Sequence, residues 1–143
     1  MAKNKFLHQA LLFSVILVVP LFLVGCLPSV GPSGVTKGSE EFVKGSVVRG
    51  FPSLPLYPKA GVLESYGSNG KYGASFITND SLAKVVKFYN DSFKKLGWNV
   101  TVSERSETNY VFSVKNDEYR GEVIVNRTAD GKKTAITMAV ESR

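Results

Sequence analysis

The stretch SLAKVVKFYNDSFKKLGW, residues 81–98, decides the fold of this chain. Its apolar side chains recur at i, i+3, i+4, i+7, i+11 and i+14, namely Leu82, Val85, Val86, Tyr89, Phe93 and Leu96. This spacing places them on one face of an α-helix, with lysines on the other side. Asp80 or Ser81 suits the helix start, and Gly97 suits the left-handed position after the last turn. The pattern predicts an amphipathic helix over about 81–96, whose apolar face needs a partner.

Alternating apolar and polar residues on both sides of this helix predict that partner, an antiparallel sheet. Two strands are expected before the helix, at 62–66 and 72–78, joined by a tight turn at 67–70. Four are expected after it, at 98–103, 110–115, 119–126 and 134–140, with polar turns between them. The predicted fold class is α+β: a two-layer sandwich in the order ββαββββ, formed by one domain at 55–143.

The first 26 residues carry an export signal. Two lysines precede an apolar run at 10–24, a pattern typical of a secretory signal peptide and short for a membrane span. The run ends in Leu23-Val24-Gly25-Cys26, which resembles the lipobox of bacterial lipoproteins. That resemblance implies cleavage between Gly25 and Cys26 and a diacylglycerol on the Cys26 thiol. The alternative is an uncleaved anchor helix in which Cys26 is incidental.

The same resemblance implies a location. A chain that begins at Cys26 would be lipid-anchored on the exported side of the cell membrane or the outer membrane, with the membrane as its partner through the lipid. Leu27, in place of Asp, leans toward the outer membrane. The whole chain has 18 Lys and Arg against 12 Asp and Glu, and two of the lysines leave with the signal peptide. This modest, interspersed charge on an exported chain does not favour a nucleic acid as partner.

Residues 26–54 differ in composition from the residues that follow, being rich in Gly, Pro and Ser. Such mixtures behave as flexible tethers. The predicted organisation is therefore a signal peptide at 1–25, the lipidated Cys26 and a tether at 26–54, and the folded domain at 55–143. Within the tether, Val47-Val48 is a candidate short strand, and a partner-binding peptide around Glu40-Glu41-Phe42-Val43 is an alternative.

Three short motifs carry a second resemblance. They are Leu54-Pro55-Leu56-Tyr57-Pro58-Lys59-Ala60, Val85-Val86-Lys87-Phe88-Tyr89 and Leu96-Gly97-Trp98. Together they resemble the pattern LPxYPxA, VxxFY and GW of small prokaryotic lipoproteins and secreted domains of unknown function. Lys59 stands where such sequences more often carry Gly. The resemblance implies a fold and a location rather than an activity.

The only His and the only Cys, His8 and Cys26, lie in the N-terminal segment. The sequence after residue 26 therefore lacks imidazole and thiol, which excludes His- and Cys-dependent catalysis, disulfides and His or Cys metal sites from the domain. Carboxylates gather near the predicted turns, at Glu104, Glu107, Asp117, Glu118, Glu122 and Asp130. Arg or Lys residues lie beside them, which favours solvated charge pairs over acid–base chemistry. No catalytic residue, metal site or cofactor is predicted, and the chain is not expected to be an enzyme.

The helix offers a candidate contact surface, formed by Phe88 with Lys84, Lys87, Lys94 and Lys95. The lysines suit anionic headgroups or cell-wall polymers, and the alternative is an ordinary solvated face. Phe88 lies off the apolar stripe. It either widens the buried face, which is the favoured interpretation, or forms an exposed contact.

The leading interpretation is a lipid-anchored protein of the cell envelope, with a non-catalytic domain that binds or scaffolds an envelope protein or a cell-surface polymer. One rival is a carboxylate-dependent envelope hydrolase acting on glycans. The other is a binder that holds a small apolar molecule between the helix and the sheet. A cavity between Tyr89, Trp98 and Phe112 would favour that last interpretation.

Overall fold

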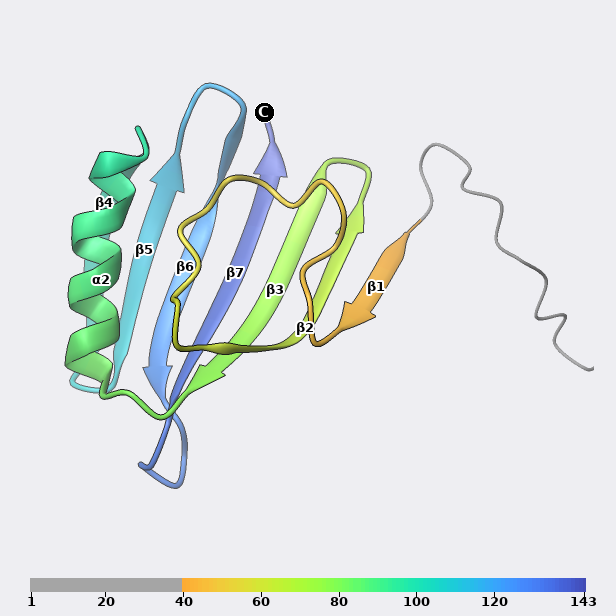
Figure 1. The fold of residues 1–143 in the computed structure, drawn as a ribbon. Helices are drawn as coiled ribbons and strands as arrows, with labels where there is room; N and C mark the ends of the chain where they lie inside the picture. The colour runs from red at the N-terminus through yellow and green to blue at the C-terminus, as the bar shows by residue number, and fades with distance from the viewer. Residues whose placement is uncertain (1–39) are drawn as a thin grey trace, which may run out of the picture. The chain divides into compact units, whose positions relative to one another are not determined.

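A computed structural model describes residues 40–143 of the protein. In this part of the chain seven antiparallel strands form one sheet in the order β1-β2-β3-β7-β6-β5-β4, and one helix packs on it (Figure 1). The elements are β1 (Glu41–Lys44), β2 (Gly61–Ser68), β3 (Lys71–Thr78), α2 (Leu82–Lys95), β4 (Asn99–Ser106), β5 (Asn109–Lys115), β6 (Tyr119–Arg127) and β7 (Thr134–Ser142). The α+β fold with the order ββαββββ is confirmed, and β1 precedes it. No helix within residues 40–143 is long and apolar enough to cross a membrane.

The ends of α2 follow the chemistry of the sequence. Ser81 is the N-cap residue and has an extended backbone, although its side chain makes no capping hydrogen bond. At the other end Gly97 has a φ of 76°. Here the Trp98 N–H donates to the Phe93 carbonyl at 3.1 Å, and the Gly97 N–H donates to the Lys94 carbonyl at 3.4 Å. These two bonds form a Schellman cap, which ends the helix within a residue of the predicted boundary.

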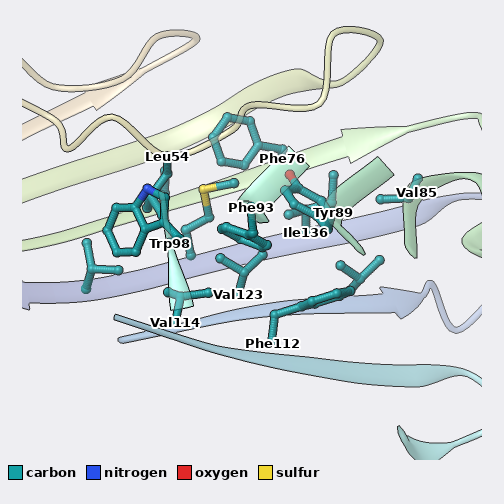
Figure 2. Packing of buried hydrophobic residues seen from close by; sticks show 14 of the residues in the cluster. Leu54, Phe76, Val85, Tyr89, Phe93, Trp98, Phe112, Val114, Val123 and Ile136 are labelled. Atoms are coloured by element: carbon teal, nitrogen blue, oxygen red, sulfur yellow. The ribbon is translucent and has the colours of Figure 1, made fainter. Parts of the chain in front are cut away.

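The apolar stripe of α2 is buried against the sheet. The helix residues Leu82, Val85, Tyr89 and Phe93 are buried and belong to one core with strand residues such as Met138. Figure 2 shows Val85, Tyr89 and Phe93 of the helix near the strand residues Phe112, Val123 and Ile136. Val86 is half-buried at the edge of this core. Leu96, predicted as the last residue of the stripe, is instead 55% exposed. It occupies the C-cap position, where the chain leaves the helical path, so helical spacing no longer decides which way its side chain points.

A long irregular segment covers the rest of that sheet face. Residues 45–60, here called the strap, cross it on the same side as α2 (Figure 1). Two strap residues, Val48 and Leu54, are buried, and Phe51 packs edge-on against Tyr72 with ring centroids 6.2 Å apart. The domain therefore begins before residue 55, and residues 41–54 are not a tether. Val47-Val48 is not a strand; the strap buries single side chains without regular pairing. The predicted tether residues 26–39 lie outside the described residues.

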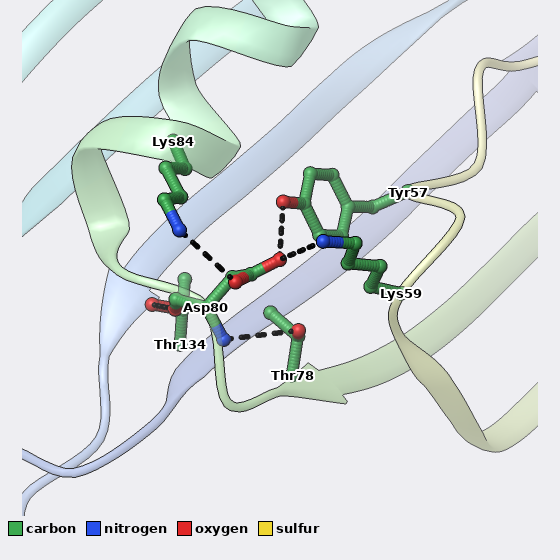
Figure 3. A network of polar contacts seen from close by, with 6 residues as sticks. All are labelled: Tyr57, Lys59, Thr78, Asp80, Lys84 and Thr134. Carbon is green, nitrogen blue, oxygen red and sulfur yellow. Dashed lines mark hydrogen bonds and ion pairs between the residues drawn. The ribbon is translucent and has the colours of Figure 1, made fainter.

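The motif residues fasten the strap to the helix. The Tyr57 hydroxyl donates to the Asp80 carboxylate at 2.8 Å, and Lys59 and Lys84 lie 3.9 and 3.5 Å from the same carboxylate (Figure 3). This hydrogen bond is the main reason that the pKa of Asp80 is lowered. The Trp98 Nε1–H donates to the Ser53 carbonyl at 3.2 Å. The LPxYPxA and GW motifs thus serve to hold the strap in place.

Candidate binding surface on the open face of the sheet

Among residues 40–143, no helix or strap covers the second face of the sheet. Because side chains alternate across a strand, residues in register form rows on this face. One row runs through Thr101, Ser113, Glu122, Ala139 and Gly73 to Tyr66, which are paired from strand to strand. Most of these side chains are small or polar, and all except Gly73 are exposed. This face is therefore open to a ligand along its whole width.

A concavity of about 850 Å³ lies on this face. We call it the open-face groove. Residues of six strands, β2 to β7, line it, among them Tyr66, Lys71, Thr101, Ser113, Arg120 and Ala139. It offers hydroxyl groups, charged groups and one aromatic ring to a ligand. The groove is open rather than enclosed, so water reaches all of these groups.

Tyr66 provides the aromatic surface. It is paired in register with Gly73, and a Cβ atom added to Gly73 would collide with the Tyr66 ring. The ring therefore lies across the glycine, as aromatic residues do where they cover a glycine on a neighbouring strand. Tyr66 remains 48% exposed. Phe42 of β1, paired with Tyr66, is 59% exposed and lies beside it.

A row of charges follows one side of the groove. Arg120 binds Glu141 on the neighbouring strand, with Nη2 2.7 Å and Nε 2.9 Å from Oε1. Lys71 and Lys115 occupy the flanking register positions, next to Glu141 and Arg120 respectively. Neither lysine forms an ion pair with any residue in the range 40–143. The row therefore places one lysine without an ion pair to a described residue on each side of the Arg120–Glu141 ion pair.

The surface predicted on the helix is arranged differently. Phe88 is half-buried, with edge-on contacts to Tyr57 and Tyr89, both at a centroid distance of 5.1 Å. It therefore widens the buried face and does not form an exposed patch. The helix lysines are exposed, and two of them have local partners: Lys84 lies 3.5 Å from Asp80 and Lys87 lies 2.9 Å from Asp91. Lys94 and Lys95 occupy the last turn, where they suit the helix dipole. All four lie on the helix side of the sheet, away from the groove.

The predicted carboxylates do not meet. Glu104 and Glu107 lie at the β4–β5 turn, and Asp117 and Glu118 lie at the opposite end of β5. The seven residues of β5 separate the two pairs by about 20 Å or more. Glu122 lines the groove alone among them. No group of three metal-ligating side chains occurs in residues 40–143. Gly25 and Cys26, the predicted cleavage and lipidation residues, lie outside the described residues.

Asp130 has a structural role. It accepts hydrogen bonds from the Thr128 hydroxyl at 2.6 Å and the Lys132 N–H at 3.0 Å, and the first of these is the main reason that its pKa is lowered. These bonds hold the β6–β7 turn in shape.

The predicted cavity between helix and sheet is filled with side chains. Tyr89 stacks on Phe93 at 5.5 Å and contacts Phe112 at 5.7 Å between ring centroids (Figure 2). None of the concavities described in residues 40–143 is lined by Tyr89, Trp98 or Phe112. The Tyr89 hydroxyl is buried, with no hydrogen-bond partner in that range. The Tyr57 backbone lies nearby without completing a bond, and burial raises the pKa of Tyr89 well above its usual value.

Comparison with protein families places this architecture. A family model described as START domain-like matches residues 62–138, more than half of the chain. The chain belongs to the START domain-like family. No curated protein and no solved structure matches it significantly.

In this START domain-like chain the matched region runs from β2 into β7 and contains α2. It includes most of the residues that line the open-face groove, from Tyr66 to Glu122, whereas β1 and the strap precede it. The groove could not be recognised from the sequence pattern, because polar residues alternating with apolar ones indicate only a solvated sheet face. The available signal was Tyr66, a large ring on the polar side of a strand, facing a glycine across the predicted hairpin.

Proposed function

We propose that the protein is a binding module of the cell envelope, tethered to a membrane by a lipid on Cys26, that holds its ligand in the open-face groove without chemical turnover. The observation that carries this proposal is the groove of about 850 Å³ on an exposed sheet face, lined by one half-exposed aromatic ring and several hydrogen-bonding groups. An aromatic surface flanked by a few polar groups is typical of a binding site.

The shape of the groove favours binding over catalysis. Catalytic sites exclude water and bring acid, base or nucleophile within hydrogen-bond reach of one another. Here the groove is open, and the carboxylate pairs lie at opposite ends of β5. The predicted carboxylate pairs therefore do not meet in the groove. Of the two carboxylates that line it, Glu122 and Glu141, the second is engaged by Arg120, which does not favour acid–base action on a glycan bond. Membership of the START domain-like family supports a ligand-binding role as well.

The ligand site is tested with a matched pair of substitutions. Ala139 is exposed and lines the groove, and Ala83 is exposed on the helix. We expect Ala139→Arg in the full chain, purified in detergent, to lose most binding to isolated cell envelopes, whereas Ala83→Arg retains it. Both variants place the same side chain on an exposed surface, so folding is preserved in each. Equal binding by the two variants contradicts the proposal.

The anchor is tested separately. Mass spectrometry of the membrane fraction should find an N-terminal peptide that starts at Cys26 and carries acyl chains, and Cys26→Ser should abolish both cleavage and lipid. A membrane-bound protein that still begins at Met1 contradicts this part of the proposal.

A second candidate function follows from the orphaned Tyr89 hydroxyl. A small amphiphilic molecule that enters the core beneath the strap would satisfy this hydroxyl with its polar group, as the family membership also favours. Such a ligand must displace the strap. The test is native mass spectrometry of the full chain after incubation with a fatty acid. Retention of the fatty acid by the wild type and its loss in Tyr89→Phe support this candidate, and equal retention contradicts it.

A further inference from the structure

We infer that the ligand of the open-face groove is an anionic glycan chain, with a sugar ring stacked on Tyr66 and acidic groups beside Lys71 and Lys115. This inference rests on the proposed function and names the chemical class of the ligand.

The pairing of Tyr66 with Gly73 in the sheet fixes the position of the Tyr66 ring. It lies across Gly73, whose missing side chain leaves room for it, and its outer face is free because the residue is 48% exposed. An aromatic face carries negative charge density and attracts the C–H groups of a sugar ring. An apolar ligand would require enclosure, which this open surface lacks. The hydroxyl groups of Thr101 and Ser113 and the carboxylate of Glu122 give a sugar hydrogen-bonding partners along the groove.

The charges favour an extended anion over a single one. The Glu141 carboxylate is engaged by Arg120, whereas Lys71 and Lys115 have no ion pair with a described residue. Lys71 is on β3 and Lys115 is on β5, three strand spacings apart in the sheet order, which is about 14 Å. Arg120 and Glu141 occupy the register positions between them, so each lysine is placed to meet an acidic group of its own. A chain with repeated acidic groups can contact both lysines, and it would also reach Tyr66 one strand further on.

The concave shape distinguishes this ligand from a membrane. A bilayer surface is flat on the scale of the groove, whereas a polymer chain lying across the strands can follow its lining, which includes Ser113 and Ala139. The exposed lysines of α2 point away from this face and take no part in the site.

The experiment measures binding of the full chain in detergent to polygalacturonate, with neutral dextran as comparison. We expect salt-sensitive binding to polygalacturonate and at least about tenfold weaker binding to dextran. Lys71→Gln with Lys115→Gln should weaken binding about fivefold to tenfold at low salt, whereas Lys94→Gln with Lys95→Gln, the same charge change on the helix, should leave it within about twofold. Equal losses in the two double variants indicate non-specific attraction and overturn the inference.

The aromatic surface has its own series of variants. Tyr66→Ala should weaken binding about tenfold, and Tyr66→Phe should keep it. Gly73→Ala removes no contacting group but displaces the ring, so it should act like Tyr66→Ala. Unchanged binding in Gly73→Ala and Tyr66→Ala overturns the stacking role. Binding to phosphatidylglycerol vesicles with the same pattern of losses would identify a membrane surface instead and overturn the glycan.

Binding to cell envelopes tests the location of the site, whereas binding to polygalacturonate tests the chemical class of its ligand. If Ala139→Arg abolishes binding to cell envelopes but no variant affects polygalacturonate binding, the groove is the binding site and its ligand is not an anionic glycan. If Ala139→Arg binds envelopes normally, the groove itself is not the site.

Discussion

Replacing Tyr89 by Phe should stabilise the protein, although Tyr89 lies at the centre of the core. Its hydroxyl is buried without a hydrogen-bond partner, while its ring packs on Phe93 and Phe112. Burying an unsatisfied polar group costs about 1–3 kcal/mol, and Tyr89→Phe removes that cost while keeping the ring contacts. The nearby Tyr57 backbone recovers part of the cost, so we expect a gain of about 1 kcal/mol in the free energy of unfolding. For a domain of this size that gain raises Tm by roughly 4–8 °C.

Trp98 is the only tryptophan and is buried at the end of α2, so its fluorescence reports unfolding of the full chain in urea. Tyr57→Phe is the matched control, because the Tyr57 hydroxyl does have a partner, the Asp80 carboxylate at 2.8 Å. We expect the midpoint of unfolding to rise in Tyr89→Phe and to fall in Tyr57→Phe. A lower midpoint in Tyr89→Phe would refute the reasoning, since it would show that the hydroxyl is bonded to a water or a ligand.

A pH series provides a second test of the same side chain. Burial raises the pKa of Tyr89 above the ordinary value of 10.0, so the unfolded chain releases this proton first as pH rises. Stability should therefore fall as pH increases above about 10, and less steeply in Tyr89→Phe. Part of the slope should remain, because burial also raises the pKa of Tyr57, Tyr110 and Tyr119.

Three further predictions concern the strap and the helix ends. The Tyr57 hydroxyl lowers the pKa of Asp80, so the stability that this contact contributes is complete above pH 3.8 and is lost as pH falls through the lowered pKa. The Tm of Asp80→Asn should therefore change less with pH in the acid range than the Tm of the wild type. Gly97 has a φ of 76°, so Gly97→Ala should lower the free energy of unfolding by about 1 kcal/mol in urea titrations, and no loss would show that the cap relaxes. Trp98→Phe removes the bond to the Ser53 carbonyl, so limited proteolysis should cut the strap faster, with unchanged cleavage as the contrary result.

Regular elements could be predicted because their signals are local. Helical spacing from Leu82 to Phe93, closed by Gly97, specified α2, and period-2 alternation specified the six strands β2 to β7. Phe88 lies off this stripe, and its half-buried position agrees with the favoured interpretation that it widens the buried face. Leu96 was predicted wrongly because spacing describes a continuing helix, and the chain leaves the helix at that residue.

The strap, β1 and the groove could not be predicted because they depend on partners distant in sequence. The Val48 N–H donates to the Ser65 hydroxyl, and Leu54 joins a core built mainly from residues after 74. Neither contact produces a periodic pattern in the sequence. The groove likewise needs the register of six strands, which brings Tyr66 and Thr101 to the same concavity. A Gly-, Pro- and Ser-rich composition indicated a tether where irregular packing was the actual structure.

The two faces of the sheet carry different residues: those that stabilise the fold lie on one face, and those proposed to bind the ligand lie on the other. Leu54, Tyr57, Phe88 and Trp98, which carry the motif resemblance, all lie on the covered face with α2 and the strap. Tyr66, Lys71 and Lys115 lie on the opposite face, where side chains contribute little to the core. This explains why motifs of this kind indicate a fold and not an activity. It also means that the groove variants should unfold like the wild type, so a change in their binding reports on the ligand site itself.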